Sequence, residues 1–277
     1  MNITGIIKDA FTYPSKKLGN YVIYLILSIL MAGFAIWGYI TYTFGFFNPE
    51  DYLFGGIFLI IAMMICFIIY GYRLKVIKSG IELDDNVPGF VWYDDFMSGF
   101  DNFVVTLFYY LIPALIVIVI GIGTNLVGNA VAIAVEVITQ IVNVYIVGAS
   151  ADVAVNAIAL TLTNFLNSLI ITLTAALILF IIFTILKFAA QARLANTGSL
   201  KAGLNIFEAI KDILSVGIGK VIALIILFVI IFGIIGFIII TLLGVSPLLS
   251  IILGILLVPY LILVAERAIG LTYSDIA

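Results

Sequence analysis

The chain has no histidine, a single cysteine and few charged residues. Without histidine it lacks the side chain that most often moves protons near neutral pH and that most often binds zinc. Cys66 has no second cysteine for an intrachain disulfide, and it lies within an apolar run, so we interpret it as a small hydrophobic side chain. No Ser–His or Cys–His nucleophile exists.

Charge is scarce throughout. Charged residues are 10% of the 277, against about 25% in soluble domains, while 65% are hydrophobic and the mean hydropathy is +1.34. A water-soluble fold cannot cover this much apolar surface with so few charges, so the solvent must be lipid. The net charge of -3 indicates no polyanionic partner, and no basic stripe suits nucleic acid.

Motifs of common chemistry are also missing. Gly121-Ile122-Gly123 lacks the later glycine of a phosphate-binding loop and follows an apolar run, not a strand. Asp84-Asp85 and Asp94-Asp95 lie in a polar connector, where we expect solvated carboxylates or, as the alternative, weak ligands of a divalent ion. We therefore expect no catalytic residue, no resident metal and no cofactor, and we do not expect an enzyme.

Six apolar runs are each long enough to cross a membrane as a helix, which takes about 20 residues. They cover residues 21–42, 52–72, 104–122, 168–188, 221–243 and 247–265. The first run is too long for the core of a signal peptide and has no cleavage site after it, so we expect it to stay as an anchor. The pattern predicts an all-α, polytopic membrane protein of about six transmembrane helices arranged as three hairpins.

The basic residues predict its orientation. If the N-terminus is inside and six segments cross, all twelve basic residues fall inside, and only Glu50, Asp51, Glu136 and Asp152 fall outside. The twelve are Lys8, Lys16, Lys17, Arg73, Lys75, Lys78, Lys187, Arg193, Lys201, Lys211, Lys220 and Arg267. Because loop lysine and arginine resist translocation, we expect both termini to be cytoplasmic and the protein to lie in the cell membrane.

Three arginines stand just past the second run of each hairpin and set this topology. They occur in Gly71-Tyr72-Arg73-Leu74, Gln191-Ala192-Arg193-Leu194 and Glu266-Arg267-Ala268-Ile269. In the simplest interpretation each arginine reaches lipid head groups near the negative end of its helix. In the alternative, the three converge on one anionic ligand or on acidic amphipathic segments.

Short amphipathic segments precede the hairpins. Their apolar faces have helical spacing, and we expect each to lie in the cytoplasmic interface with that face in lipid. The faces are Ile3, Ile6, Ile7, Ala10 and Phe11, then Trp92, Tyr93, Phe96, Phe100 and Phe103, then Ile206, Phe207, Ile210, Ile213 and Leu214. The order of segment, span, span and arginine predicts pseudo-repeats 1–78, 79–201 and 202–277 within a single membrane domain, 1–277.

Residues 124–167 interrupt this pattern. They are apolar but carry a polar stripe of Asn129, Glu136, Gln140 and Asn143, and a second one of Asn156, Thr163 and Asn167. The segment is an extracytoplasmic helical pair on the membrane surface, a pair of further membrane-embedded helices, or a pair whose second helix continues into the fourth span. Two more crossings and a turn are cramped between 151 and 188, so we favour six spans, a long second helix and an outer hydrophobic hairpin.

Glu136 is the one acid well away from turns and charged clusters. An ionisable group at membrane depth indicates function, so the first stripe is a candidate site for a cation or a proton. The simpler interpretations are that Glu136 faces outside water or that the amides join helices by hydrogen bonds. A closed cavity with Asn156 or Thr163 opposite Glu136 would favour transport.

Further phrases carry a family resemblance. In order they are Phe11-Thr12-Tyr13-Pro14-Ser15, the stretch from Gly71 to Gly80, Val87-Pro88-Gly89-Phe90 with Gly99, Ala192-Arg193-Leu194-Ala195-Asn196, and Arg267-Ala268-Ile269-Gly270. The chain thereby resembles the archaeal membrane family known as domain of unknown function 4013, frequent in methanogens. The resemblance implies a multi-pass archaeal membrane protein without an established activity, and it transfers no catalytic residue. Residues 124–167 lie outside the matching pattern.

The leading hypothesis for function is a non-enzymatic integral membrane protein. It would be an accessory, scaffold or lipid-interacting component, with membrane lipids, other copies of itself or other membrane proteins as partners. The alternative is a small transporter or channel that uses Asn129, Glu136, Gln140 and Asn143, and an intramembrane enzyme comes third.

Overall fold

A computed structural model describes residues 1–277, and all of its regular structure is helical, which confirms the all-α prediction. The elements are α1 (Ile3–Thr12), the 3-10 helix η1 (Tyr13–Lys17), α2 (Leu18–Phe44), α3 (Glu50–Ile81), α4 (Trp92–Gly123), α5 (Leu126–Val142), the π-helix η2 (Asn143–Val147), α6 (Ala151–Thr197), α7 (Leu200–Gly203), α8 (Ile206–Val216), α9 (Ile218–Val245) and α10 (Pro247–Tyr273). Two compact units result. The first comprises Met1–Thr106 and Leu186–Ala277, and the second comprises Leu107–Ile185.

Several helices are long and apolar enough to cross a membrane, which indicates a membrane-spanning protein. Seven stretches qualify by length and composition: Ile3–Phe44, Glu50–Ile81, Trp92–Gly123, Leu126–Val147, Ala151–Thr197, Ile218–Val245 and Pro247–Tyr273. Each of the six predicted runs lies within one of them. The remaining stretch, Leu126–Val147, contains none of the six runs and belongs to the segment 124–167. The number of six crossings stays a prediction.

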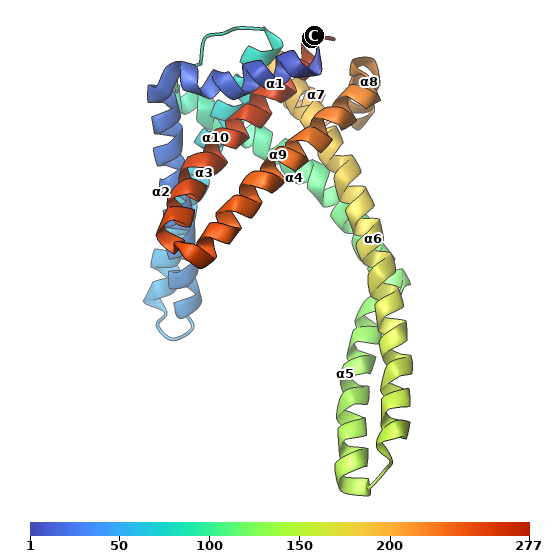
Figure 1. Cartoon of the computed structure of the whole chain (residues 1–277). Coiled ribbons are helices and arrows are strands. Elements are labelled where there is room, and N and C mark those ends of the chain that lie inside the picture. Colours follow the sequence, from blue (N-terminus) through green and yellow to red (C-terminus); the bar gives the residue numbers. More distant parts are fainter. The chain divides into compact units, whose positions relative to one another are not determined.

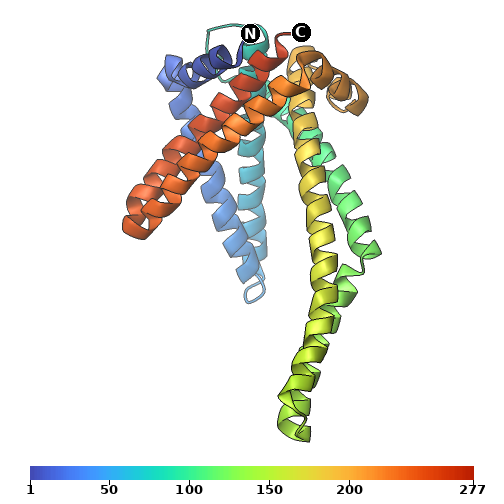
Figure 2. The ribbon, with the colours of Figure 1, turned by 45° about the vertical axis from the view of Figure 1, so that its right-hand side comes forward.

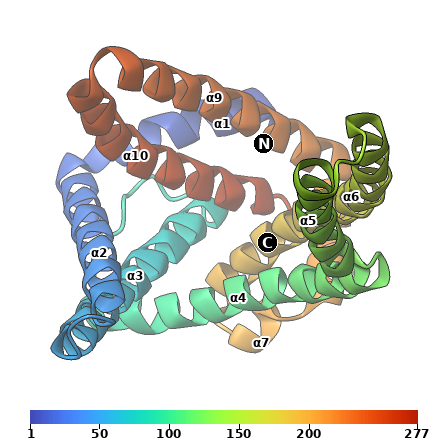
Figure 3. The same ribbon diagram turned by 90° about the horizontal axis from the view of Figure 1, so that it is seen from below.

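The first unit contains two helical hairpins, α2–α3 and α9–α10 (Figure 1). Figure 2 shows the turns of both hairpins at the end away from the two labelled termini. The termini meet directly, because the Met1 ammonium lies 2.7 Å from Asp275 Oδ1. Helix α10 packs against α3 as well as α9, and the view from below places it between them (Figure 3).

Glycines allow the closest helix crossings of this unit. A Cβ on Gly71 of α3 would lie 1.8 Å from the Asp95 carbonyl oxygen, and one on Gly99 of α4 would lie 1.7 Å from the Phe67 carbonyl oxygen. Likewise, a Cβ on Gly270 of α10 would lie 2.1 Å from the carbonyl oxygen of Ile77. Membrane helices associate through small residues that let backbones approach, and here they bring α3 against both α4 and α10.

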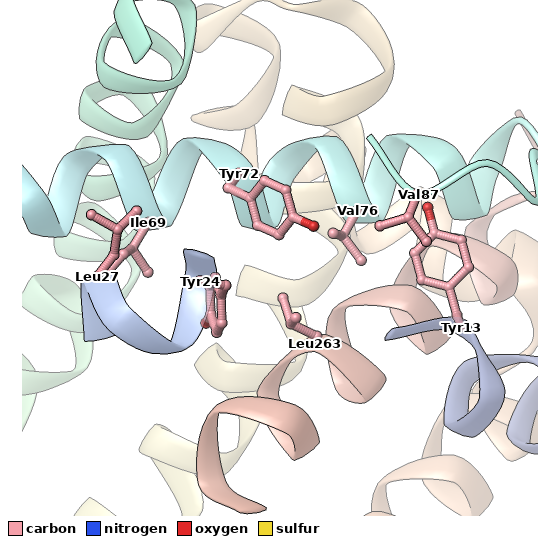
Figure 4. Packing of buried hydrophobic residues seen from close by; sticks show 8 residues of the cluster. All are labelled: Tyr13, Tyr24, Leu27, Ile69, Tyr72, Val76, Val87 and Leu263. Carbon is pink, nitrogen blue, oxygen red and sulfur yellow. The ribbon is translucent and has the colours of Figure 1, made fainter. Parts of the chain in front are cut away.

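A cluster of buried aromatic and aliphatic residues lies between these helices (Figure 4). It combines residues from η1, α2, α3, the connector before α4, and α10: Tyr13, Tyr24, Leu27, Ile69, Tyr72, Val76, Val87 and Leu263. The connector is held by ring stacking, since the centroids of Tyr72 and Phe90 lie 4.1 Å apart. The cluster thus joins the N-terminal segment to two hairpins.

The predicted amphipathic segments take different forms. The first and third are separate helices, α1 and α8, whereas the second continues into its span as one helix, α4. The apolar face of α1 is covered by protein, because Ile6 and Ala10 are fully buried against α9 and α10. The expectation that this face lies in lipid is therefore wrong for α1. On α8, by contrast, Phe207 and Leu214 are exposed.

The second unit is built from the end of α4, α5 and most of α6. Thr124 and Thr172 hydroxyls lie 3.1 Å apart, and α5 then runs beside the first part of α6 (Figures 1 and 2). Asn125 separates α4 from α5 with a left-handed backbone, φ 53°. Helix α6 is continuous over 47 residues. The structure therefore has the long second helix that we favoured, and no turn between 151 and 188.

We predict that Gly71→Ala lowers the free energy of unfolding by about 1–3 kcal/mol, the usual cost of overpacking. The added methyl group meets the backbone of α4, which cannot shift as a side chain can. Thermal unfolding in detergent measures the effect.

Gly56→Ala is the matched control, because it lies on the same helix and its added methyl group would have nothing within 4 Å. It should change stability by no more than about 1 kcal/mol. Equal effects of the two substitutions would contradict the close crossing of α3 and α4.

Candidate functional site

Three acid–base pairs dominate the first unit. Each joins a carboxylate of an amphipathic segment to a basic side chain at the end of a hairpin. The pairs are Asp9 with Arg267 at 2.8 Å, Asp95 with Lys75 at 2.6 Å, and Asp212 with Arg193 at 2.8 Å. In terms of the predicted repeats, the first segment pairs with the third hairpin, the second with the first, and the third with the second. Each amphipathic segment therefore pairs with the end of a different hairpin, and none pairs with the hairpin of its own predicted repeat.

Arg267 is the most enclosed of these bases, with 1% of its side chain exposed. Its Nε donates to Asp9, and its Nη1 donates to the Asp84 carbonyl oxygen at 2.8 Å and to the Ser79 hydroxyl at 3.2 Å. The guanidinium also lies 4.1 Å from the centroid of the Tyr13 ring. The interpretation that this arginine reaches lipid head groups is therefore wrong.

Arg193 binds the acidic face of α8. Its Nη1 donates to Asp212 and lies 3.9 Å from Glu208, while the Tyr273 hydroxyl donates to the same Asp212 oxygen at 2.8 Å. The alternative interpretation, in which arginines meet acidic amphipathic segments, is confirmed for Arg193 and Arg267. Within α8 itself, Lys211 donates to Glu208 at 2.8 Å and holds the pKa of that carboxyl below its ordinary value.

Asp95 anchors the start of α4. Its side chain is fully buried, Oδ2 accepts the Val91 backbone N–H at 2.7 Å, and Oδ1 lies 2.6 Å from Lys75 Nζ. A buried carboxylate is tolerated when it is paired and hydrogen-bonded. This residue therefore ties the N-terminal end of α4 to α3.

Arg73 pairs with a different acid, Glu266 of α10. Both Nε and Nη2 of Arg73 donate to Glu266 Oε1, and Nε lies at 2.6 Å. The guanidinium lies 4.8 Å from the Tyr70 ring centroid. Because Arg73, Arg193 and Arg267 bind separate acids, they do not converge on one anionic ligand.

Two buried amides extend this polar layer, and the sequence interpretation did not single them out. Gln191 Nε2 donates to Asn102 Oδ1 at 2.8 Å, and Asn102 donates to the Tyr70 carbonyl oxygen at 3.0 Å. The available signal was positional, since Gln191 stands in the phrase that contains Arg193 and Asn102 follows Asp101 in the second amphipathic segment. Together they link α3, α4 and α6.

The structure brings together three members of the predicted polar stripe in the second unit. Gln140 Nε2 donates to Glu136 Oε1 at 2.7 Å, and Asn143 Nδ2 donates to Gln140 Oε1 at 3.3 Å. Asn129 is apart from them and donates to the Asn164 carbonyl oxygen of α6 at 3.5 Å. The bonds of Glu136 and Gln140 thus run along one helix, and that of Asn129 joins two.

The second stripe does not enclose Glu136 in a cavity. Asn156, Thr163 and Asn167 are exposed, and the Thr163 hydroxyl donates to the Ala159 carbonyl oxygen of its own helix at 2.8 Å. The arrangement that would favour transport, with Asn156 or Thr163 across a closed cavity, is not formed. The hydrogen bond of Asn129 instead fits the interpretation that amides join helices.

Comparison with known proteins identifies one family. The family model described as "Protein of unknown function (DUF4013)" matches residues 54–245, which is more than half of the chain. This range includes residues 124–167, which the sequence resemblance places outside the family pattern. No curated protein and no solved structure matches the chain. The archaeal origin implied by the resemblance stays a prediction.

Removing the buried guanidinium of Arg267 should destabilise the protein strongly. Arg267→Met leaves the Asp9 carboxylate without its partner, and breaking a buried pair costs about 3–5 kcal/mol. Lys211→Met, which removes an exposed ammonium from a surface pair, should cost no more than about 1 kcal/mol. Chemical or thermal unfolding in detergent compares them, and equal losses would contradict the importance of the buried site.

The contact between the chain ends should depend on pH. Lys220 donates to Asp275, as does the Met1 ammonium, and these two cations hold the pKa of that carboxyl below its ordinary value. The contribution to stability is therefore full above the ordinary Asp pKa of about 3.9 and is lost as the pH falls through the lower pKa of the folded state.

Asp275→Asn tests this linkage. The variant should be less stable than the parent chain at pH 7, and the difference should vanish in acid below the folded-state pKa of Asp275. Melting temperatures over a pH series give the comparison. A difference that persists or grows toward acid would show that the carboxylate does not act through its charge.

Proposed function

The chain belongs to the family described as Protein of unknown function (DUF4013), and we propose that it is a non-enzymatic, multi-pass protein of the cell membrane that acts as a scaffold. Its termini lie on the cytoplasmic side. Its partners are membrane lipids and membrane proteins, including copies of itself. The proposal goes beyond the family, whose description states no function.

The observation that carries the proposal is where the charged residues lie and which residues they bind. All twelve basic residues lie in the first unit, whereas the second unit holds only the acids Glu136 and Asp152. In the first unit the most buried charges, such as Arg267, are bound to acids of the same chain. The polar groups of the protein therefore stabilise its own fold, which is what a structural component needs.

Exposed apolar surface supports lipid as the solvent of the helices. Along α9, for example, Val229, Ile234, Phe237 and Ile240 have exposed fractions of 65%, 57%, 68% and 70%. Soluble monomers rarely expose a continuous apolar patch of this extent. Lipid chains cover such side chains without cost, so we place α9 in the membrane with its hairpin partner α10.

We place α8 in the cytoplasmic interface. Its acidic side chain Asp212 faces Arg193, while Phe207, Ile210 and Leu214 are exposed. Apolar side chains of an interfacial helix enter the boundary between head groups and acyl chains. This helix supplies the contact with lipid that α1 does not make.

We expect the polar stripe of α5 not to conduct ions, and only its Asn129 joins α5 to α6. Glu136 is already hydrogen-bonded to Gln140 on the same helix, and the side chains predicted to complete a site with it are exposed. In proteoliposomes the protein should therefore give no ion flux, and Glu136→Gln should leave that result unchanged. A flux that Glu136→Gln abolishes would establish the transporter alternative.

Cysteine labelling tests the topology. In a Cys66→Ala background, a membrane-impermeant maleimide should label Asp51→Cys and Ser150→Cys in intact cells. It should label Lys201→Cys only after the cells are permeabilised, because position 201 lies among the basic residues that we place on the cytoplasmic side. Labelling of position 201 from outside, or release of the chain from membranes by alkaline carbonate, would contradict the proposal.

A further inference from the structure

The exposed side chains of the α2–α3 hairpin change in kind along its length. Between Leu18 and Ile36 of α2, the large exposed side chains are all valine, leucine or isoleucine. Aromatic rings then dominate the exposed surface toward the turn, at the end of the hairpin away from the termini (Figure 2). We name six of them, with exposed fractions of 42% to 80%, the aromatic belt: Trp37, Tyr39, Tyr42, Phe46, Phe47 and Tyr52.

Close packing at the turn holds these rings in place. The ring centroids of Tyr42 and Tyr52 lie 5.2 Å apart across α2 and α3, and those of Phe46 and Phe47 lie 5.3 Å apart. Gly55 lets the two helices approach here, because a Cβ on it would lie 2.5 Å from the Tyr42 backbone nitrogen. The aromatic belt is therefore a fixed part of the hairpin.

Several rings of the belt also carry a polar group. The hydroxyls of Tyr39, Tyr42 and Tyr52 and the indole N–H of Trp37 form no hydrogen bond within the chain. Acyl chains cannot supply hydrogen-bond partners, whereas the head-group layer contains phosphate and ester oxygens and water. Tryptophan and tyrosine are enriched at membrane–water interfaces because one end of the ring is apolar and the other end polar.

The depth of the belt matches the thickness of a bilayer. Trp37 follows Lys17, the last basic residue before α2, by twenty residues, which is about 30 Å of helix. The hydrocarbon core is also about 30 Å thick, and the head groups increase the total to about 40–45 Å. Tyr42 lies about 8 Å beyond Trp37 along the helix axis. With Lys17 at the inner boundary, the belt thus begins where the hydrocarbon core ends.

The rings surround α2 and do not form one face. Tyr39 and Tyr42 lie about 200° and about 140° round the helix from Trp37, yet all three are exposed. A protein partner would cover one side of the helix, whereas a lipid interface covers every side at one depth. The change from aliphatic to aromatic side chains follows depth and not helix face, which favours lipid.

We propose that the aromatic belt is a lipid-binding surface that holds the turn of the α2–α3 hairpin at the boundary between head groups and acyl chains of the outer leaflet. The rings lie among the first acyl carbons, and their hydroxyl and indole groups reach the head-group layer. Glu50 and Asp51, at the start of α3, then lie in the water outside. This proposal rests on the proposed function, since it takes the protein as membrane-spanning.

Depth-dependent fluorescence quenching tests the position of the belt. Trp37 and Trp92 are the two tryptophans of the chain, so Trp92→Phe leaves Trp37 as the reporter. The full chain is reconstituted in phosphatidylcholine vesicles whose lipid carries bromine either next to the head group or near the ends of the acyl chains. Because bromine quenches tryptophan at close range, Trp37 should be quenched several times more by bromine next to the head group.

Ile26→Trp, in a chain that also carries Trp37→Phe and Trp92→Phe, is the matched control. Ile26 is 50% exposed and lies on the same side of α2 as Trp37, because eleven residues make about three turns. It lies about 16 Å nearer the middle of the bilayer. The variant should therefore be quenched more by bromine near the chain ends.

The outcomes separate this proposal from the proposed function. Equal quenching of Trp37 by the two lipids, or stronger quenching by bromine near the chain ends, overturns the belt. Quenching of the Ile26→Trp variant without any quenching of Trp37 shows that protein or water covers the belt, and this also overturns it. If neither is quenched, α2 is not in lipid, and the proposed function fails as well.

Tyr52→Trp extends the test to α3. In the Trp37→Phe and Trp92→Phe background it should be quenched mainly by bromine next to the head group, as Trp37 is, because Tyr52 packs beside Tyr42. Stronger quenching by bromine near the chain ends would contradict a belt that includes both helices.

Discussion

Salt bridges between segments far apart in the chain decide how the first unit is assembled. A charged side chain removed from water costs several kcal/mol unless it is paired and hydrogen-bonded. Arg267 satisfies that condition only where Asp9, Ser79 and the Asp84 carbonyl meet, so the N-terminal segment and α10 must come together there. The acyl chains of lipid have no hydrogen-bonding groups to substitute for these partners. The pairs therefore select which helix ends meet, even where their net stabilisation is small.

The other contacts between helices are close backbone packing and polar side-chain interactions. Gly71, Gly99 and Gly270 bring helices close enough for dispersion forces, which replace the hydrophobic effect between helices in lipid. The side chains that point away from these crossings are apolar and exposed, as on α9. In the second unit, which has no basic residue, the Asn129 amide and the pair of Thr124 and Thr172 hydroxyls join helices instead. Both features fit lipid as the solvent. Buried charged residues occur only in the first unit, where they are paired, and the helices leave apolar side chains exposed.

The sequence predicted the helices well because length and hydropathy are local properties. It also predicted a long second helix after residue 151, since no glycine or proline occurs between 153 and 190. The sequence did not predict whether protein or lipid covers a given helix face. The spacing of Ile6 and Ala10 indicates one apolar side of α1 but cannot distinguish lipid from α10. The steps from Glu136 to Asn143 correctly grouped three polar residues, whereas the position of Thr163 depended on the rotation of α6 about its axis, which no local pattern specifies.

A specific acid–base pairing joins the amphipathic segments to the hairpin ends. The most direct measurement of it is a charge exchange at the pair of α6 and α8, with unfolding followed for Arg193→Asp, Asp212→Arg and the double variant. Each single variant should be destabilised, and the double variant should regain a measurable part of the loss, because opposite charges again face each other. A double variant as unstable as the sum of the single losses would contradict the pairing.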